Sequence, residues 1–180
     1  ADGTANPDFI AADFLSQAEH GADSQAMLVT SAESIVSPVV DAIQQQLSEL
    51  SRRDITAKAL EHSRIIVLKD EQEVIAFTNM YAPEHLIIQT ENYAHIAEQI
   101  ENAGSVFMGP YTPESAGDYA SGTNHTLPTN GYAKAYSGVN LDSFIKKITF
   151  QEITAEGIKN LGGTIQTMAG NEQLDAHRNA

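Results

Sequence analysis

Ala82-Pro83-Glu84-His85-Leu86 joins a predicted helix to a predicted strand and sets a carboxylate and an imidazole side by side at the junction. Pro83 keeps Ala82 out of the helical region, so the preceding helix ends here. Residues 86–89 continue as a strand that can hold the pair rigidly. An imidazole titrates near neutrality and can take a proton from a hydroxyl, while a neighbouring carboxylate can orient it or activate a water. The stretch therefore indicates proton transfer, although an exposed polar corner would have the same sequence.

Strands and helices alternate on both sides of this stretch. Asn6 and Pro7 are typical of an N-cap and a first helical position, and the apolar repeat after them ends at Gly21. Strands are expected at residues 26–30, 64–68, 86–89 and 106–108. Helices are expected at 31–50 with a kink at Pro38, from 54 onward, at 70–80 with Asp70 as the cap, and from about 90 to 104. This order predicts an α/β fold with a largely parallel sheet.

Regular alternation ends at Gly109. Residues 109–138 are rich in turn formers and polar groups, and a loop of this length usually carries function. The remainder predicts helical pieces around Phe144, at 158–168 and at 172–178, with a strand-like segment at 148–153. Short helices gain little stability unless they pack, so either a second subunit or this same chain must cover the apolar stripe on residues 158–168.

Composition argues against several classes of partner. Acidic residues outnumber basic ones by 24 to 10, so the clustered cations that nucleic acid or an anionic membrane requires are missing. The absence of cysteine excludes disulfides, thiolate zinc sites and thiol nucleophiles within these residues. No apolar run reaches membrane-spanning length and the start has no secretory pattern, so a cytoplasmic location is expected.

Several side chains elsewhere are candidate metal or substrate ligands. Gln17 and His20 are three residues apart on the first predicted helix and share a face. Asp118 and His177 add a carboxylate and an imidazole, which zinc accepts together with an occasional amide oxygen. His125 lies in the long loop, where a structural role and a substrate contact are both open. Each of these could instead be an ordinary surface group, and no HExxH helix, Walker loop or GxGxxG is present.

Three long motifs in register nevertheless resemble histidinol dehydrogenase. They are Leu15-Ser16-Gln17-Ala18-Glu19-His20-Gly21, Ala82-Pro83-Glu84-His85-Leu86, and Gly109-Pro110-Tyr111-Thr112-Pro113-Glu114-Ser115-Ala116-Gly117-Asp118-Tyr119 with Gly122-Thr123-Asn124-His125. Their order and spacing fit across nearly the whole chain, including residues 172–177. The resemblance implies an NAD-dependent oxidoreductase of histidine biosynthesis that converts L-histidinol through L-histidinaldehyde to L-histidine, with two NAD and a water.

The resemblance also implies roles for individual residues. The zinc ligands would be Gln17, His20, Asp118 and His177. The proton-transfer groups would be Glu84 and His85. Substrate contacts would come from Gln17, His20, His85, Asp118, His125, Glu172 and His177. No residue of this chain is assigned to NAD.

Members of the family are far longer, and the resemblance covers their C-terminal part. It implies a partial Rossmann-like architecture, in which residues 1–80 complete one Rossmann-like domain and residues 81–138 return to a second with the catalytic loop. Residues 139–180 would form a mainly helical tail in a homodimer with shared active sites. Because the NAD site lies mostly upstream, the segment alone is expected to be inactive. Two other functions remain open: a non-catalytic zinc-binding or oligomerisation module, and a metal-dependent hydrolase.

Overall fold

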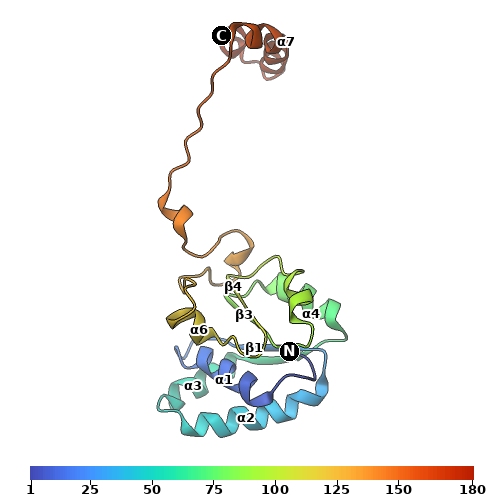
Figure 1. Ribbon diagram of the computed structural model, residues 1–180, viewed down its shortest axis with the longest axis vertical. Coiled ribbons are helices and arrows are strands. Elements are labelled where there is room, and N and C mark those ends of the chain that lie inside the picture. The colour runs from blue at the N-terminus through green and yellow to red at the C-terminus, as the bar shows by residue number, and fades with distance from the viewer. The chain divides into compact units, whose positions relative to one another are not determined.

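Two compact units make up the chain in the computed structural model, which describes residues 1–180. Ala1–Ser143 forms the first unit and Phe144–Ala180 the second. The first unit contains all the strands (Figure 1). β1 (Met27–Thr30) pairs in parallel with β2 (Arg64–Val67), and β3 (His85–Ile88) pairs in parallel with β4 (Ser105–Met108). The predicted mixed α/β class with parallel strands is confirmed, although the strands form two small sheets rather than one.

Three helices pack together beside β1 and β2. They are α1 (Pro7–Ala18), α2 (Val36–Glu49) and α3 (Arg53–His62), and Figure 1 shows them on one side of the unit. The Asn6 side chain caps α1 by accepting from the Asp8 N–H, and Pro7 is the first helical residue, as predicted. The apolar face of α1 lies in the larger core, whose biggest members include Ile10, Phe14, Leu28, Val39 and Ile43.

Two further helices accompany β3 and β4. α4 (Glu71–Tyr81) begins after Asp70, whose carboxylate accepts from the Glu73 N–H, so the predicted cap is confirmed. α5 (Tyr93–Ala97) lies against both strands. A smaller core of Ile75, Ile88 and Ile96 joins α4, β3 and α5.

Pro38 does not kink a helix, contrary to expectation. A short 3-10 turn, η1 (Glu33–Ile35), comes first, and α2 begins only at Val36. Pro38 therefore occupies the first turn of α2. The first N–H groups of a helix have no intrahelical partner, so proline loses nothing there and the helix stays regular.

The helix expected to reach Gly104 ends much earlier, at Ala97. Beyond it, the Asn79 side chain of α4 accepts from the backbone N–H groups of Glu101 and Asn102 at 2.8 and 3.2 Å. These bonds take the place of helical ones, so the segment that leads into β4 is irregular. Such a partner comes from a distant part of the sequence and leaves no local signal.

The long polar segment after β4 contains one short helix, α6 (Glu114–Tyr119), and a 3-10 turn, η2 (Tyr132–Lys134). α6 approaches β4 closely at Gly117. A Cβ at this position would lie 2.6 Å from Cε1 of Phe107, so no larger residue fits without a shift. The glycine thus fixes the distance between α6 and the sheet.

The second unit is helical. α7 (Ala155–Asn171) and α8 (Asp175–Asn179) pack on each other, and η3 (Leu141–Phe144) lies at the unit boundary. Residues 148–153 are not a strand, because nothing pairs with them. Glu172 caps the end of α7 instead of starting the next helix, and Gln173 turns the chain with a φ of 60°. The apolar stripe on α7 is exposed at Ile158, Leu161, Ile165 and Met168.

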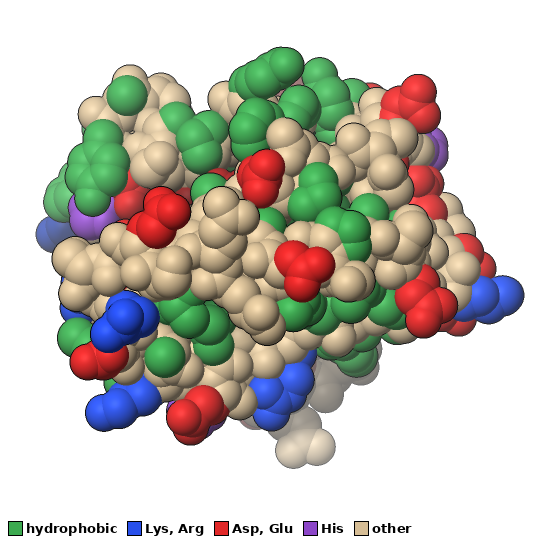
Figure 2. Space-filling model, turned by 90° about the horizontal axis from the view of Figure 1, so that it is seen from below, with side chains coloured by type: hydrophobic (Ala, Val, Ile, Leu, Met, Phe, Trp, Pro, Cys, Tyr) green, Lys and Arg blue, Asp and Glu red, His purple; other side chains and the backbone are tan.

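The outer surface is mixed in character. Figure 2 shows one face, on which Lys and Arg side chains are scattered among acidic, apolar and neutral polar groups. No helix of the chain combines the length and the apolar character needed to cross a membrane.

Candidate functional site

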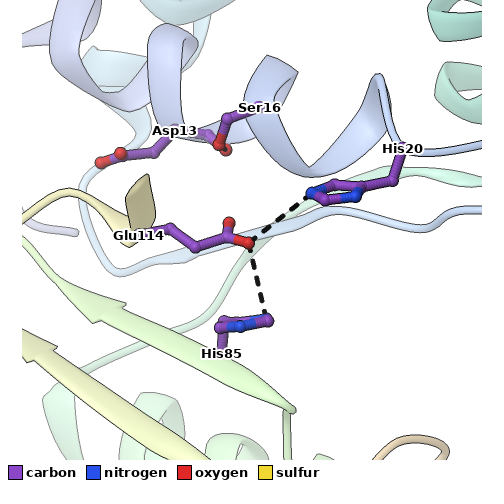
Figure 3. A network of polar contacts seen from close by, with 5 residues as sticks. All are labelled: Asp13, Ser16, His20, His85 and Glu114. Carbon is purple, nitrogen blue, oxygen red and sulfur yellow. Dashed lines mark hydrogen bonds and ion pairs between the residues drawn. The ribbon is translucent and has the colours of Figure 1, made fainter. Parts of the chain in front are cut away.

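Three elements of the first unit bring polar side chains to one buried carboxyl group, that of Glu114. This residue begins α6 and is only 3% exposed. Figure 3 shows its side chain extending between α1 and β3, with His20 on one side and His85 on the other. His20 follows the end of α1, and His85 is the first residue of β3. Glu114 therefore contacts a histidine that lies 94 positions earlier in the sequence, His20.

The distances around Glu114 distinguish two kinds of contact. Its Oε1 lies 3.9 Å from Nε2 of His20 and 3.7 Å from Nδ1 of His85, which are ion-pair separations rather than hydrogen bonds. Gln17 makes the shorter contact. With its amide nitrogen turned to the carboxylate, as the surrounding donors and acceptors require, it donates to Oε1 at 3.2 Å and Oε2 at 3.3 Å.

A row of polar side chains runs along α1 and just past its end. Asp13 and Gln17 are four residues apart and share one face of the helix, whereas His20 lies beyond Ala18, the last residue of α1, contrary to the expectation that it shares that helix face. At one end of the row, Asp13 Oδ2 accepts from Nε2 of Gln89, the residue that follows β3, at 2.8 Å. At the other end, the Glu114 carboxylate contacts Gln17, His20 and His85. The site therefore lies between α1 and β3 (Figure 3).

Burial controls the charge of Glu114. Desolvation, together with the negative charges of Asp118, Glu84 and Asp13, raises the pKa of this carboxyl from 4.5 to about 7, and the nearby Ser16 hydroxyl opposes the rise. Near neutral pH the carboxyl therefore exists in both its protonated and its ionised form. It can exchange a proton with its surroundings at physiological pH.

Burial acts on His85 in the opposite direction. Desolvation lowers the pKa of its imidazole, while the nearby charges of Glu84 and Asp118 partly oppose that effect. Its side chain is 13% exposed and tilts against the ring of Phe107. At pH 7 the ring is mainly neutral, which is the form that can accept a proton.

The backbone of β4 fixes the corner that carries Glu84. The Gly104 N–H donates to the Pro83 carbonyl, and the Ser105 N–H donates to the Glu84 carbonyl, both at 2.9 Å. A Cβ on Gly104 would lie 2.5 Å from that Glu84 oxygen. Just before the corner, Ala82 takes a left-handed conformation with φ 56°. The corner is consequently rigid, as expected for a site that must hold two side chains in place.

The structure brings some of the predicted site residues together and leaves others apart. Gln17, His20 and His85 converge on Glu114. Glu84, Asp118 and the exposed His125 lie near enough to His85 to influence its pKa. Glu172 and His177 are exposed residues of the second unit.

Glu114 itself was not predicted as a site residue. It stands in the third sequence motif, but its only local signal is a carboxylate at the start of a helix, which also occurs at ordinary helix ends. Its partners come from α1 and β3, so its role becomes visible only in three dimensions.

The donor groups fit zinc in kind. Imidazole nitrogen, carboxylate oxygen and amide oxygen are all zinc ligands, and His20, Asp118 and Gln17 offer one of each in the first unit. No group of three or more His, Asp or Glu side chains in residues 1–180 is already arranged around a metal position. A cavity of about 850 Å³ is lined by Gln17, Glu84, His85 and Glu114, among others, but not by His20 or Asp118. Its size suits a small ligand.

The fold and the site define an α/β protein in which side chains of the kinds that bind zinc lie near a partly buried imidazole. Comparison with known proteins gives the family. Residues 1–180 match the family model described as histidinol dehydrogenase. The histidinol dehydrogenase of Bacteroides thetaiotaomicron is 64% identical over all 180 residues, and that of Vibrio parahaemolyticus is 54% identical. The chain belongs to the histidinol dehydrogenase family.

A solved structure agrees with this assignment. The crystal structure of histidinol dehydrogenase from Elizabethkingia anophelis superposes with a TM-score of 0.94 at 58% identity, over 99% of this chain and 41% of that one. Similarly, the chain spans 42% of the length of the Bacteroides thetaiotaomicron relative. It also matches 22% of a putative bifunctional histidine biosynthesis protein, HisCD, of Photorhabdus laumondii, at 55% identity.

Proposed function

We propose that this chain supplies the zinc-binding and proton-transfer part of a histidinol dehydrogenase. The complete enzyme would oxidise L-histidinol through L-histidinaldehyde to L-histidine, the last steps of histidine biosynthesis, with two NAD. The convergence of Gln17, His20 and His85 on Glu114 carries the proposal, because it brings two candidate zinc ligands, from α1 and just beyond its end, next to the candidate base of β3. Family membership over residues 1–180 supplies the identity of the reaction.

Each side chain has a role in this proposal. Gln17, His20, Asp118 and His177 would hold a zinc ion, which would bind the imidazole and amine of the substrate and orient its carbinol carbon toward NAD. His85, neutral because burial lowers its pKa, accepts the proton of the histidinol hydroxyl. Glu84 activates the water that hydrates the aldehyde before the second oxidation. His125 and Glu172 complete the contacts to substrate.

The proposal extends to the assembly. Residues 1–80 and 81–138 would each complete a Rossmann-like domain, and residues 139–180 would pack on the second subunit of a homodimer. The exposed stripe of Ile158, Leu161, Ile165 and Met168 supports this, since about 25 cal/mol is gained for each Å² of apolar surface removed from water. His177 and Glu172 would then complete the site of the other subunit.

A chimera tests the function. Residues 1–180 replace the matching segment of the Bacteroides thetaiotaomicron histidinol dehydrogenase, and NAD reduction is followed with L-histidinol as substrate. We expect histidinol-dependent reduction by the chimera and none by the 180-residue chain alone, which contains no glycine-rich phosphate loop. A folded, zinc-loaded chimera without histidinol-dependent NAD reduction would contradict the proposal. Hydrolysis of an ester or amide by that chimera would favour a metal-dependent hydrolase instead.

A further inference from the structure

We infer that Glu114 is a positioning residue, which fixes the orientation of Gln17, His20 and His85 and thereby determines which atom of each is free for a metal ion or substrate. The contacts of Glu114 do not depend on the proposed function. The use of the remaining ligand atoms in metal binding and catalysis rests on it.

Gln17 gives the clearest case. An amide side chain can be turned by 180° with almost no change in shape, so only its hydrogen bonds determine which end faces the site. Both oxygens of Glu114 lie within 3.3 Å of the amide nitrogen when that nitrogen faces them. In this orientation the carbonyl oxygen, the only atom of the amide that can bind a metal ion, is directed away from Glu114. In its ionised form, Glu114 thus selects the useful orientation of Gln17.

The two histidines follow the same logic with different atoms. His85 presents Nδ1 to Glu114 at 3.7 Å, which is longer than a hydrogen bond, so the carboxylate acts on the imidazole through its charge and leaves Nε2 for proton transfer. His20 presents Nε2 to the same oxygen at 3.9 Å, which leaves Nδ1 for other contacts. A histidine that acts as a ligand or base commonly directs its other nitrogen to a carboxylate, which fixes both the tautomer and the direction of the ring. Because a single carboxylate contacts both a candidate ligand and the candidate base, it fixes their positions relative to each other.

Stability alone gives little reason to bury a carboxyl group at this place. Removing a charged group from water costs free energy, and apolar replacements of buried ion pairs are often neutral or stabilising. Glu114 is 3% exposed, and the partners it reaches are two candidate ligands and the candidate base. α6 holds it there through the close packing of Gly117 on Phe107. The burial of Glu114 is therefore explained better by the positioning of these three side chains than by a contribution to stability.

Glu114→Gln is the informative substitution. It keeps the size of the side chain but removes the negative charge that attracts the two imidazoles and one of the two acceptor oxygens that face Gln17. Glu98→Gln is the matched control, because it makes the same chemical change at an exposed position. Should Glu114→Gln not fold, as judged by circular dichroism, Glu114→Asp replaces it, since it keeps the charge but withdraws the carboxylate by one methylene.

The first measurement uses nitrogen NMR of the imidazoles in the metal-free 180-residue chain. In the wild type, we expect His85 to carry its proton on Nδ1. In Glu114→Gln, we expect a mixture of tautomers at His85 and altered nitrogen shifts at His20, with neither change in Glu98→Gln. The second measurement is zinc affinity of the chimera by chelator competition, which should weaken by about 10- to 100-fold in Glu114→Gln, the usual effect of losing an outer carboxylate.

The results separate this inference from the proposed function. Wild-type imidazole spectra together with wild-type zinc affinity in Glu114→Gln would overturn the positioning role, even if the chimera oxidises histidinol. Altered tautomers in a chain whose chimera lacks histidinol-dependent activity would support the positioning role and reject the proposed function.

Discussion

Asp13 Oδ2 accepts a hydrogen bond from Nε2 of Gln89 at 2.8 Å, which ties the middle of α1 to the end of β3. Burial raises the pKa of Asp13 from 3.8 to about 6, although this hydrogen bond acts against the shift. The negative charge of Asp13 also contributes to the raised pKa of Glu114. The hydrogen bond between α1 and the end of β3 therefore involves a carboxyl group whose pKa is unusually high.

This relationship predicts how stability depends on pH. A raised pKa in the folded state favours folding below the unfolded pKa of 3.8, and the contribution is lost as pH rises through about 6. Asp13→Asn cannot ionise but still accepts from Gln89. As the pH rises from 4 to 7, the unfolding free energy of this variant should therefore increase by about 1 to 2 kcal/mol relative to that of wild type. This figure is smaller than the full pKa shift implies, because Asp13 is only partly buried and solvent screens its charge.

Urea unfolding of the 180-residue chain at both pH values measures this gain. Asp41→Asn, at an exposed position of α2, is the control and should show no such gain. Equal pH dependence in Asp13→Asn and wild type would rule out the assigned effect of Asp13.

Glu84→Gln is predicted to separate the two oxidation steps. The variant keeps the size of the side chain but cannot accept a proton from water, so hydration of the aldehyde should slow while the first oxidation continues. In the chimera, oxidation of supplied L-histidinaldehyde should fall by about 100-fold or more, the usual contribution of a general base. The same rate of aldehyde oxidation in Glu84→Gln and the parent chimera would mean that another group activates the water.

Shared active sites predict complementation between subunits. His177 belongs to the second unit and His20 to the first. A heterodimer of His177→Ala and His20→Ala chimeras would contain one site with all its ligands if His177 acts across the interface. Mixed samples should then recover part of the parent activity and zinc content. Proven subunit exchange without any recovery would show that His177 acts within its own chain.

Much of the fold could be predicted from the sequence because its signals are local. The caps at Asn6 and Asp70 depend on side chains that bond to nearby backbone groups, so residue type and spacing are sufficient. The early end of α5 could not be predicted in this way. It depends on Asn79, which lies more than twenty positions away along the chain.

The same distinction applies to the site. The Glu84-His85 pair follows from adjacency, and the nearness of Gln17 and His20 follows from their spacing of three, although α1 ends before His20 and the two do not share a helix face as expected. The carboxyl group that joins them belongs to a third element, and its burial and raised pKa depend on the packing of α1, β3 and α6 around it. Sequence motifs identified the candidates, whereas only the structure shows that Glu114 connects them.

The central claim is that His85 is the base of a histidinol-oxidising site, and His85→Asn in the chimera tests it most directly. Asparagine keeps a polar side chain but cannot take up a proton at neutral pH, so the rate of histidinol oxidation should fall by about 100- to 10,000-fold. His95→Asn, on the exposed surface of α5, should leave the rate unchanged. Steady-state NAD reduction is measured alongside zinc content. A large loss of rate with zinc retained is the predicted result, and a rate equal to that of the parent chimera would contradict the account.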